Sequence, residues 1–220
     1  MPEANPPKIG HHLIALAGTA LAAAAAQAAP SPDDRAATTE KAMHADERTT
    51  LTIGIMALPM FGDPLPKEAI LGAGYVAGIP RLGVPALTQT DASLGVAYVG
   101  GARKDGATAL PSGMAMGATW NAPLLEAAGA LIAGEAHAKA FNVLLAGGIN
   151  LVRDPRNGRN FEYLGEDPLH SGLLGGAAVA GIQSQHVIST VKHFALNGLD
   201  TGRHFVVVII TIISASTIFK

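Results

Sequence analysis

The chain has 220 residues, of which 49% are hydrophobic and only 15% charged, so it is long enough for one sizeable folded domain and too apolar for a disordered protein. Its net charge is −2 and it has no run rich in lysine or arginine, which argues against a nucleic-acid partner. The absence of cysteine excludes disulfides and thiolate sites, and the eight histidines lack the spacing of metal ligands, so we predict no metal and no cofactor.

The first 28 residues resemble an export signal. Lys8 supplies a positive charge, residues 13–26 form an apolar run of small residues, and Ala26-Gln27-Ala28 matches the small-x-small pattern of a cleavage site. An alanine-rich first helix is the alternative interpretation. We expect a signal peptide at residues 1–28 and therefore a periplasmic or secreted bacterial protein.

The next two stretches give weaker structural signals. Residues 29–50 are polar and rich in alanine and threonine, which predicts a linker or leader that runs into a short helix near residues 40–48. Residues 51–79 mix glycine and proline with apolar residues, which predicts irregular wrapping with little regular structure.

From residue 86 onward, apolar strands alternate with helices. The predicted strands lie at 86–90, 108–120, 142–149 and 187–194, and the predicted helices lie at 122–140 and 168–184. Asn121 is placed to cap the first of these helices, and Pro123 lies near its first turn. Strands without polar alternation indicate a parallel sheet buried on both faces. An α/β barrel and a doubly wound sheet both fit this order.

The most informative stretch is the charged segment at residues 153–167. It holds three arginines and four carboxylates in fifteen residues, with a proline, two glycines and two asparagines among them, so no continuous helix or strand fits it. The segment follows a buried strand, and loops at the carboxyl ends of strands are where α/β proteins place their chemistry. Arginine–carboxylate pairs that only hold the shape of the loop are the alternative.

Four polar residues lie at or just past strand ends: Asp91, Arg159, Lys192 and His193. If the strands are parallel, all four face one rim of the sheet, where their donors and acceptors suit a small molecule with many hydroxyl groups. Each also has a plainer reading. Asp91 could cap a helix, Lys192 could pair with a loop carboxylate, and His193 could be a hydrogen-bonded histidine at a strand end.

Several stretches, in order, carry a family resemblance that extends from about residue 50 to residue 203. They are residues 79–91, 109–113 with 118–121, 142–145, 153–162, 165–168, and 181–185 with 191–194. Together they resemble glycoside hydrolase family 3, the β-glucosidase-like enzymes. The domain organisation we expect is therefore a signal peptide (1–28), a leader (29–50), a partial N-terminal barrel domain (51–203) and an apolar tail (204–220).

The resemblance implies an N-terminal (β/α)₈ barrel, of which about the first half is present here. It implies removal of a terminal β-linked glucose or similar sugar with retention of configuration, so the expected partner is a β-glucoside or oligosaccharide substrate. The residues that match the family's substrate-binding positions are Asp91, Arg159, Lys192 and His193. Many members have Gly-Pro after the aspartate, where this chain has Ala92-Ser93.

The bond-breaking groups of the family have no match in this sequence. Retaining hydrolysis needs a nucleophile and an acid/base, and in the family the nucleophile is an aspartate in a Ser-Asp-Trp-like motif late in the barrel. After His193 the only acidic residue is Asp200, which does not resemble that motif. We expect no hydrolysis by this chain alone, and a non-catalytic sugar-binding remnant or inactive fragment is the alternative. A phosphate-binding α/β enzyme is the third reading, and no glycine-rich phosphate-loop pattern supports it.

The end of the sequence differs in character from the family. Residues 205–219 carry no charge, which is the pattern of a truncated or frame-altered product with a strand-forming, aggregation-prone tail. The run is shorter than the roughly 20 apolar residues of a membrane span, so a membrane is not the predicted partner and a tail anchor is the alternative. An open half-barrel exposes sheet edges, which predicts self-association.

Overall fold

The computed structural model describes residues 29–58, 64–97, 103–194, 197–200 and 202. The chain divides into two compact units, residues 1–41 and 42–220, and the second contains the sheet and its helices. The predicted signal peptide and the predicted apolar tail lie outside the described residues. No helix within the described part of the chain is both long and apolar enough to cross a membrane.

Two helices occupy the predicted leader. Helix α1 spans Pro32–Ala42 and helix α2 spans Ala45–Thr52. The prediction of a linker that runs into a short helix near residues 40–48 was wrong in its bounds, because α1 fills most of the expected linker and ends at Ala42, and α2 begins at Ala45. The backbone N–H of His44 donates to the Glu47 carboxylate at 2.8 Å, and this local bond fixes the start of α2.

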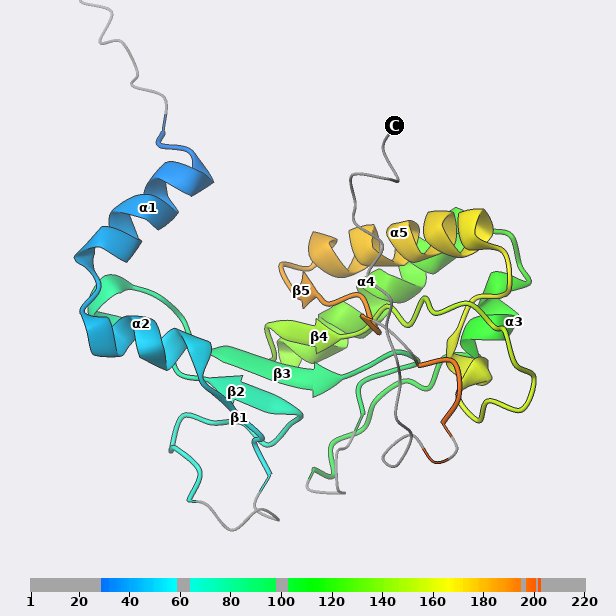
Figure 1. The fold of residues 1–220 in the computed structure, drawn as a ribbon, viewed down its shortest axis with the longest axis horizontal. Helices are drawn as coiled ribbons and strands as arrows, with labels where there is room; N and C mark the ends of the chain where they lie inside the picture. Colours follow the sequence, from blue (N-terminus) through cyan, green and yellow to red (C-terminus); the bar gives the residue numbers. More distant parts are fainter. Residues whose placement is uncertain (1–28, 59–63, 98–102, 195–196, 201, 203–220) are drawn as a thin grey trace, which may run out of the picture. The chain divides into compact units, whose positions relative to one another are not determined.

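Within the described residues, five short strands form one sheet in the order β1-β2-β3-β4-β5 (Figure 1). Their bounds are Gly54–Ile55, Gly74–Val76, Leu87–Asp91, Val143–Leu145 and Ile188–Ser189. The predicted parallel pairing is confirmed for β3, β4 and β5, whereas β1 and β2 pair antiparallel. The irregular wrapping predicted for residues 51–79 was therefore wrong for these two strands. Strand β1 pairs with β2 over two residues, and β2 pairs with β3 over three. These pairings, rather than a sequence pattern of their own, make the two segments strands. The predicted burial on both faces was wrong for β5, where Ile188 is 50% exposed.

The region predicted as a strand at residues 108–120 instead contains helix α3, Gly113–Gly117. The Ser112 hydroxyl accepts a hydrogen bond from the Ala115 N–H at 3.1 Å and so caps this helix. A Cβ built at Gly113 would collide with the Glu162 carbonyl group, and one at Gly117 would collide with the Leu164 carbonyl group. The two glycines therefore let α3 lie directly against the charged loop, which an apolar sequence pattern does not reveal.

The two long helices match their predicted positions. Helix α4 spans Ala122–Ala138, and helix α5 spans Pro168–Ser184. The side chain of Asn121 accepts from the Leu124 N–H at 3.1 Å, and that of Asp167 accepts from the His170 N–H at 2.7 Å. These two caps fix where the helices begin.

Helices α4 and α5 pack directly against each other (Figure 1). Glycines permit the contact, because a Cβ at Gly129 would collide with the Ala178 carbonyl group and one at Gly181 with the Glu126 carbonyl group. The result is a β3-α4-β4-α5-β5 unit in which each parallel strand lies beside the next. Such a unit occurs in an α/β barrel and in one half of a doubly wound sheet.

The main core lies between this unit's sheet and its helices. Phe141 and Leu144 are buried on the sheet side, and Ile132, Ile182 and Val187 complete the same cluster. This packing holds β3, β4 and β5 in register, with Asp91 opposite Leu145 where β3 and β4 end. The side chains beyond these strand ends therefore project from a fixed platform.

Candidate functional site

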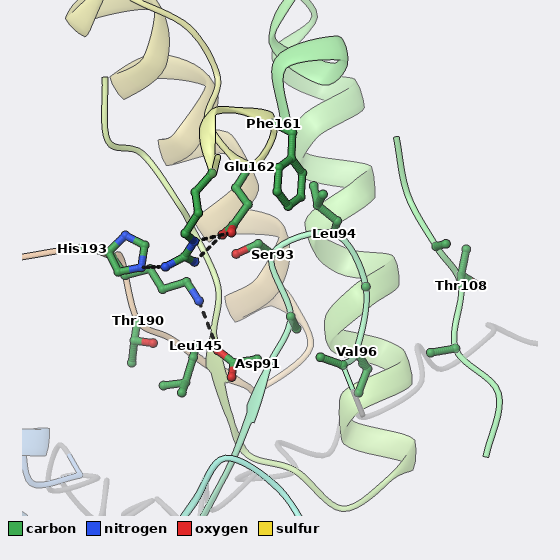
Figure 2. Close-up of a pocket in the computed structure, with 17 residues that line it drawn as sticks. Asp91, Ser93, Leu94, Val96, Thr108, Leu145, Phe161, Glu162, Thr190 and His193 are labelled. Carbon is green, nitrogen blue, oxygen red and sulfur yellow. Dashed lines mark hydrogen bonds and ion pairs between the residues drawn. The ribbon is translucent and has the colours of Figure 1, made fainter. Parts of the chain in front are cut away.

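A pocket of about 920 Å³ opens at the carboxyl ends of the parallel strands (Figure 2). All four residues predicted from the strand ends line it: Asp91, Arg159, Lys192 and His193. They come from the end of β3, from the charged loop after β4, and from the segment after β5. The structure thus brings together every residue that the sequence proposed for a site.

Asp91 and Lys192 form an ion pair among the residues that line the pocket. The Lys192 Nζ donates to Asp91 Oδ1 at 3.1 Å, although the residues are 101 positions apart. The backbone of Lys192 is held in place by a parallel β-bridge with Gly148. Among the described residues the second Asp91 oxygen accepts no hydrogen bond, and the side chain is 43% exposed. Asp91 therefore keeps an acceptor for a ligand in the pocket.

Arg159 connects the charged loop to His193. Its Nε and Nη2 donate to the two Glu162 carboxylate oxygens at 2.6 and 2.7 Å, and its Nη1 lies 3.1 Å from His193 Nε2. The reading that Arg159 pairs within its own loop is correct for two nitrogens, and the third reaches the pocket-lining histidine. Because a guanidinium only donates, His193 Nε2 acts here as the acceptor.

The same contacts shift the pKa values of the ion pair. Burial by itself raises the pKa of Glu162, but the hydrogen bonds and positive charge of Arg159 outweigh it and hold that pKa below its usual range. Glu162 in turn raises the pKa of Arg159. Both groups are therefore charged at neutral pH, and Glu162 is a carboxylate rather than a proton donor.

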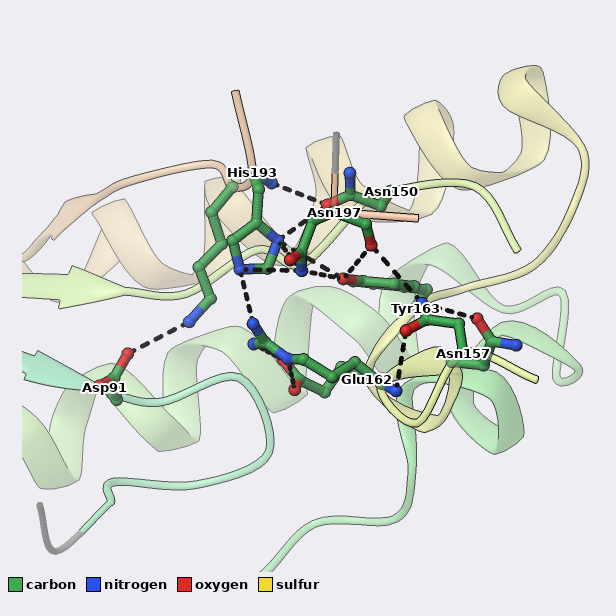
Figure 3. A network of polar contacts seen from close by, with 10 residues as sticks. Asp91, Asn150, Asn157, Glu162, Tyr163, His193 and Asn197 are labelled. Atoms are coloured by element: carbon green, nitrogen blue, oxygen red, sulfur yellow. Dashed lines mark hydrogen bonds and ion pairs between the residues drawn. The ribbon is translucent and has the colours of Figure 1, made fainter. Parts of the chain in front are cut away.

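A set of amide and phenol groups fixes the His193 ring (Figure 3). Asn150 Oδ1 lies 2.9 Å from His193 Nδ1 and accepts the His193 backbone N–H at 2.8 Å. The Asn197 amide lies 3.0 Å from the same ring nitrogen and donates to Tyr163 Oη at 2.5 Å. Tyr163 is fully buried, which raises its pKa, although the Asn197 hydrogen bond lowers it in part. His193 is consequently hydrogen-bonded within the protein, as the alternative interpretation expected, and its fixed ring also lines the pocket.

The charged loop keeps its shape through its own polar groups. The Val152 N–H donates to the Gly165 carbonyl at 3.0 Å, which closes the base of the loop. Inside it, Asn160 Nδ2 donates to the Asp154 carbonyl at 2.8 Å, and a single 3-10 turn spans Asn160–Glu162. The prediction of no continuous helix or strand is confirmed. Asn157, which is 5% exposed, anchors the loop interior.

Sequence reasoning missed four residues of this network: Asn150, Glu162, Tyr163 and Asn197. Glu162 lies three residues after Arg159, and on a helical turn this spacing brings two side chains together. A helical turn expected there would therefore have indicated Glu162. The other three carry no comparable signal, because the contacts of Asn150 and Tyr163 with His193 and Asn197 span 30 to 43 positions.

The pocket carries both hydrogen-bond donors and acceptors, and its positive and negative charges nearly balance. Two cations, Arg159 and Lys192, are each paired with a carboxylate, and the pocket wall also carries an imidazole and the Thr190 side chain. Such a surface suits neutral polar groups such as hydroxyls better than an ion. Within the described residues no cluster of three or more histidine, aspartate or glutamate side chains is placed to hold a metal ion.

Comparison with known proteins gives a consistent result. Residues 70–211 match the family model described as "Glycosyl hydrolase family 3 N terminal domain". The chain is 42% identical over 129 residues to a beta-glucosidase of Rhizobium radiobacter, an alignment that covers 57% of this chain and 15% of that protein. It is 39% identical over 135 residues to Beta-glucosidase BoGH3A of Bacteroides ovatus, which covers 57% of this chain and 18% of the relative.

Solved structures agree with the curated relatives. The beta-glucosidase 3B of Thermotoga neapolitana in complex with glucose matches with a TM-score of 0.67 and 32% identity, over 75% of this chain and 24% of that chain. DesR, a beta-glucosidase from Streptomyces venezuelae in complex with D-glucose, matches with a TM-score of 0.65 and 32% identity, over 77% of this chain and 20% of that chain. The 220-residue chain thus spans less than a quarter of the length of these relatives.

Proposed function

The chain belongs to glycosyl hydrolase family 3, and on this premise we propose that it forms the sugar-binding part of a β-glucosidase-type site. The family match confirms the predicted barrel-type α/β fold, of which β3 to β5 with α4 and α5 are the described portion. The proposed ligand is the terminal glucosyl or a similar residue of a β-glucoside or oligosaccharide.

The observation that carries this proposal is the convergence of Asp91, Arg159, Lys192 and His193 on one pocket. Neighbouring hydroxyl groups of a sugar donate to a carboxylate such as Asp91 and accept from cations such as Lys192 and Arg159. These are the four residues that the family resemblance assigned to substrate binding. Two of the structurally similar β-glucosidases were solved with glucose, which supports the same ligand class here.

We further propose that this chain positions the sugar without breaking the glycosidic bond. Retaining hydrolysis needs two carboxyl groups about 5–5.5 Å apart, one as nucleophile and one as acid/base. The 220 residues contain no Ser-Asp-Trp sequence. The two pocket carboxylates are already engaged, Asp91 with Lys192 and Glu162 with Arg159, and the lowered pKa of Glu162 makes it a poor proton donor.

Calorimetric titration of the purified 220-residue chain with D-glucose tests the proposal. Asp91→Asn keeps the shape but loses a charged acceptor, and we expect a loss in affinity of about 10- to 100-fold. Asp105→Asn is the matched control, because Asp105 is similarly exposed and also bonded to a lysine, with Lys139 Nζ at 3.0 Å, but does not line the pocket. Equal affinity of the Asp91 variant and the wild type would refute the sugar-binding role.

The same protein separates binding from turnover. We expect no release of the aryl group from an aryl β-glucoside. Turnover that Asp91→Asn abolishes would show that this chain hydrolyses substrate by itself, contrary to the second part of the proposal.

Self-association through the open sheet edge is a separate proposal. Of the described strands, β1 and β5 are outermost, and near β5 the side chains of Ile188 and Val191 are 50% and 53% exposed. Unpaired strand edges with apolar side chains favour pairing with another chain. Size-exclusion chromatography should show oligomers, and a sharp monomer peak over a wide concentration range would contradict this. Export through residues 1–28 stays a proposal that rests on the sequence pattern.

A further inference from the structure

The hydroxyl group of Ser93 has no structural role in the described residues. Ser93 lies two positions after Asp91 and lines the same pocket, and in the view of Figure 2 it lies between Asp91 and Glu162. Its Oγ is buried and makes no hydrogen bond within the described part of the chain.

No described residue forms a hydrogen bond with the Ser93 hydroxyl. Besides the pocket, Ser93 lines a smaller cavity of about 50 Å³, and Glu162 also lines both spaces. The rest of that cavity is mostly aliphatic side chains and glycine. Both Glu162 oxygens accept from Arg159, and neither accepts from Ser93 Oγ. A buried hydroxyl without a partner destabilises a fold, so this group has a cost that no hydrogen bond in the described part of the chain offsets.

Ser93 also lines the proposed sugar pocket. A serine side chain has three staggered rotamers about its first torsion angle, and a change of rotamer moves the hydroxyl without moving the backbone. The loop itself is tied to the strand end, because the Ala97 N–H donates to the Asp91 carbonyl at 2.7 Å. Ser93 is therefore held at a fixed offset from Asp91, on a wall that a bound sugar would contact.

We propose that the Ser93 hydroxyl forms a hydrogen bond with one hydroxyl group of the sugar bound beside Asp91, and so acts as a specificity residue of this site. The inference rests on the proposed sugar-binding function. It adds a neutral contact, able both to donate and to accept, to the charged contacts of Asp91 and Lys192. The hydroxyl is unpaired in the free protein and becomes paired when the sugar binds.

This assignment predicts opposite effects of one substitution on stability and on affinity. Ser93→Ala removes an unpaired buried hydroxyl, so we expect a melting temperature higher by roughly 2–8 °C. The same variant should bind D-glucose about three- to tenfold more weakly, the loss expected for one neutral hydrogen bond. Ser171→Ala is the matched control, because Ser171 Oγ is also buried and has no hydrogen-bond partner among the described residues, but it lies in α5 and does not line the pocket. It should raise the melting temperature and leave glucose affinity unchanged.

Monodeoxy analogues of glucose identify the hydroxyl group that Ser93 contacts. One analogue should bind the wild type and Ser93→Ala with equal affinity, because it lacks the partner of the serine, and the others should keep the three- to tenfold difference. Wild-type affinity of Ser93→Ala for glucose, a lowered melting temperature, or an equal loss with every analogue would each overturn the inference. A wild-type chain that binds no glucose would instead overturn the proposed function on which the inference rests, and the Asp91→Asn titration identifies that case.

Discussion

Replacing Glu162 by glutamine should both destabilise the protein and loosen the pocket. The Arg159–Glu162 pair has two hydrogen bonds of 2.6 and 2.7 Å, and its side chains are only 23% and 12% exposed. Exposed ion pairs contribute about 0–1 kcal/mol, and breaking a fully buried pair costs about 3–5 kcal/mol. For this largely but not fully buried pair we expect a loss of about 1–3 kcal/mol, because the glutamine amide points a donor at a guanidinium that only donates.

Thermal melts followed by circular dichroism measure this cost. For a domain of this size we expect a fall in melting temperature of roughly 2–10 °C, together with weaker glucose binding, because Arg159 is no longer held against His193. Arg156→Met is the control, since Arg156 also makes two hydrogen bonds to a carboxylate of the same loop but is 82% exposed. Its melting temperature should barely change. If Glu162→Gln shifts the melting temperature no more than Arg156→Met, the reasoning from burial is refuted.

Two further predictions concern the same loop and the helix pair. The pKa of Glu162 is lowered on folding, so its contribution to the free energy of unfolding is fully present above the ordinary glutamate pKa of about 4.3 and is lost as the pH falls through the pKa of the folded state. The stability difference between wild type and Glu162→Gln should therefore shrink from pH 7 to pH 3. A constant difference would contradict this. In α5, Gly181→Ala should lower the stability by about 1–3 kcal/mol, because the added Cβ meets the Glu126 carbonyl group. A Cβ at Gly176 meets nothing within 4 Å, so Gly176→Ala should stabilise the helix by about 0.5–1 kcal/mol. Equal shifts of the two variants in denaturant melts would contradict the packing of α4 on α5.

The elements that the sequence predicted are those with local signals. Helices α4 and α5 begin where Asn121 and Asp167 cap them, and a proline follows each cap, so their bounds follow from a few neighbouring residues. Strand β3 ends at Asp91 as expected. Because parallel strands bring their carboxyl ends to one edge, Asp91 and Lys192 meet although the sequence separates them by 101 positions.

The parts that were not predicted depend on partners distant in the sequence. Strand β2 is three buried residues whose pairing comes from β3, and α3 depends on glycines that fit against the charged loop. The contacts of Tyr163 with His193 and Asn197 likewise join residues that no local pattern relates. The strand-end residues could therefore be named from the sequence, but the network that holds them could not.

The most direct test of this account is a crystal structure of the chain with D-glucose at saturating concentration. We expect one sugar in the pocket at the carboxyl ends of β3 to β5, with hydroxyl oxygens at hydrogen-bond distance, about 2.6–3.2 Å, from the Asp91 carboxylate and Lys192 Nζ. A sugar bound only elsewhere on the chain, or a pocket that holds no sugar under these conditions, would contradict it.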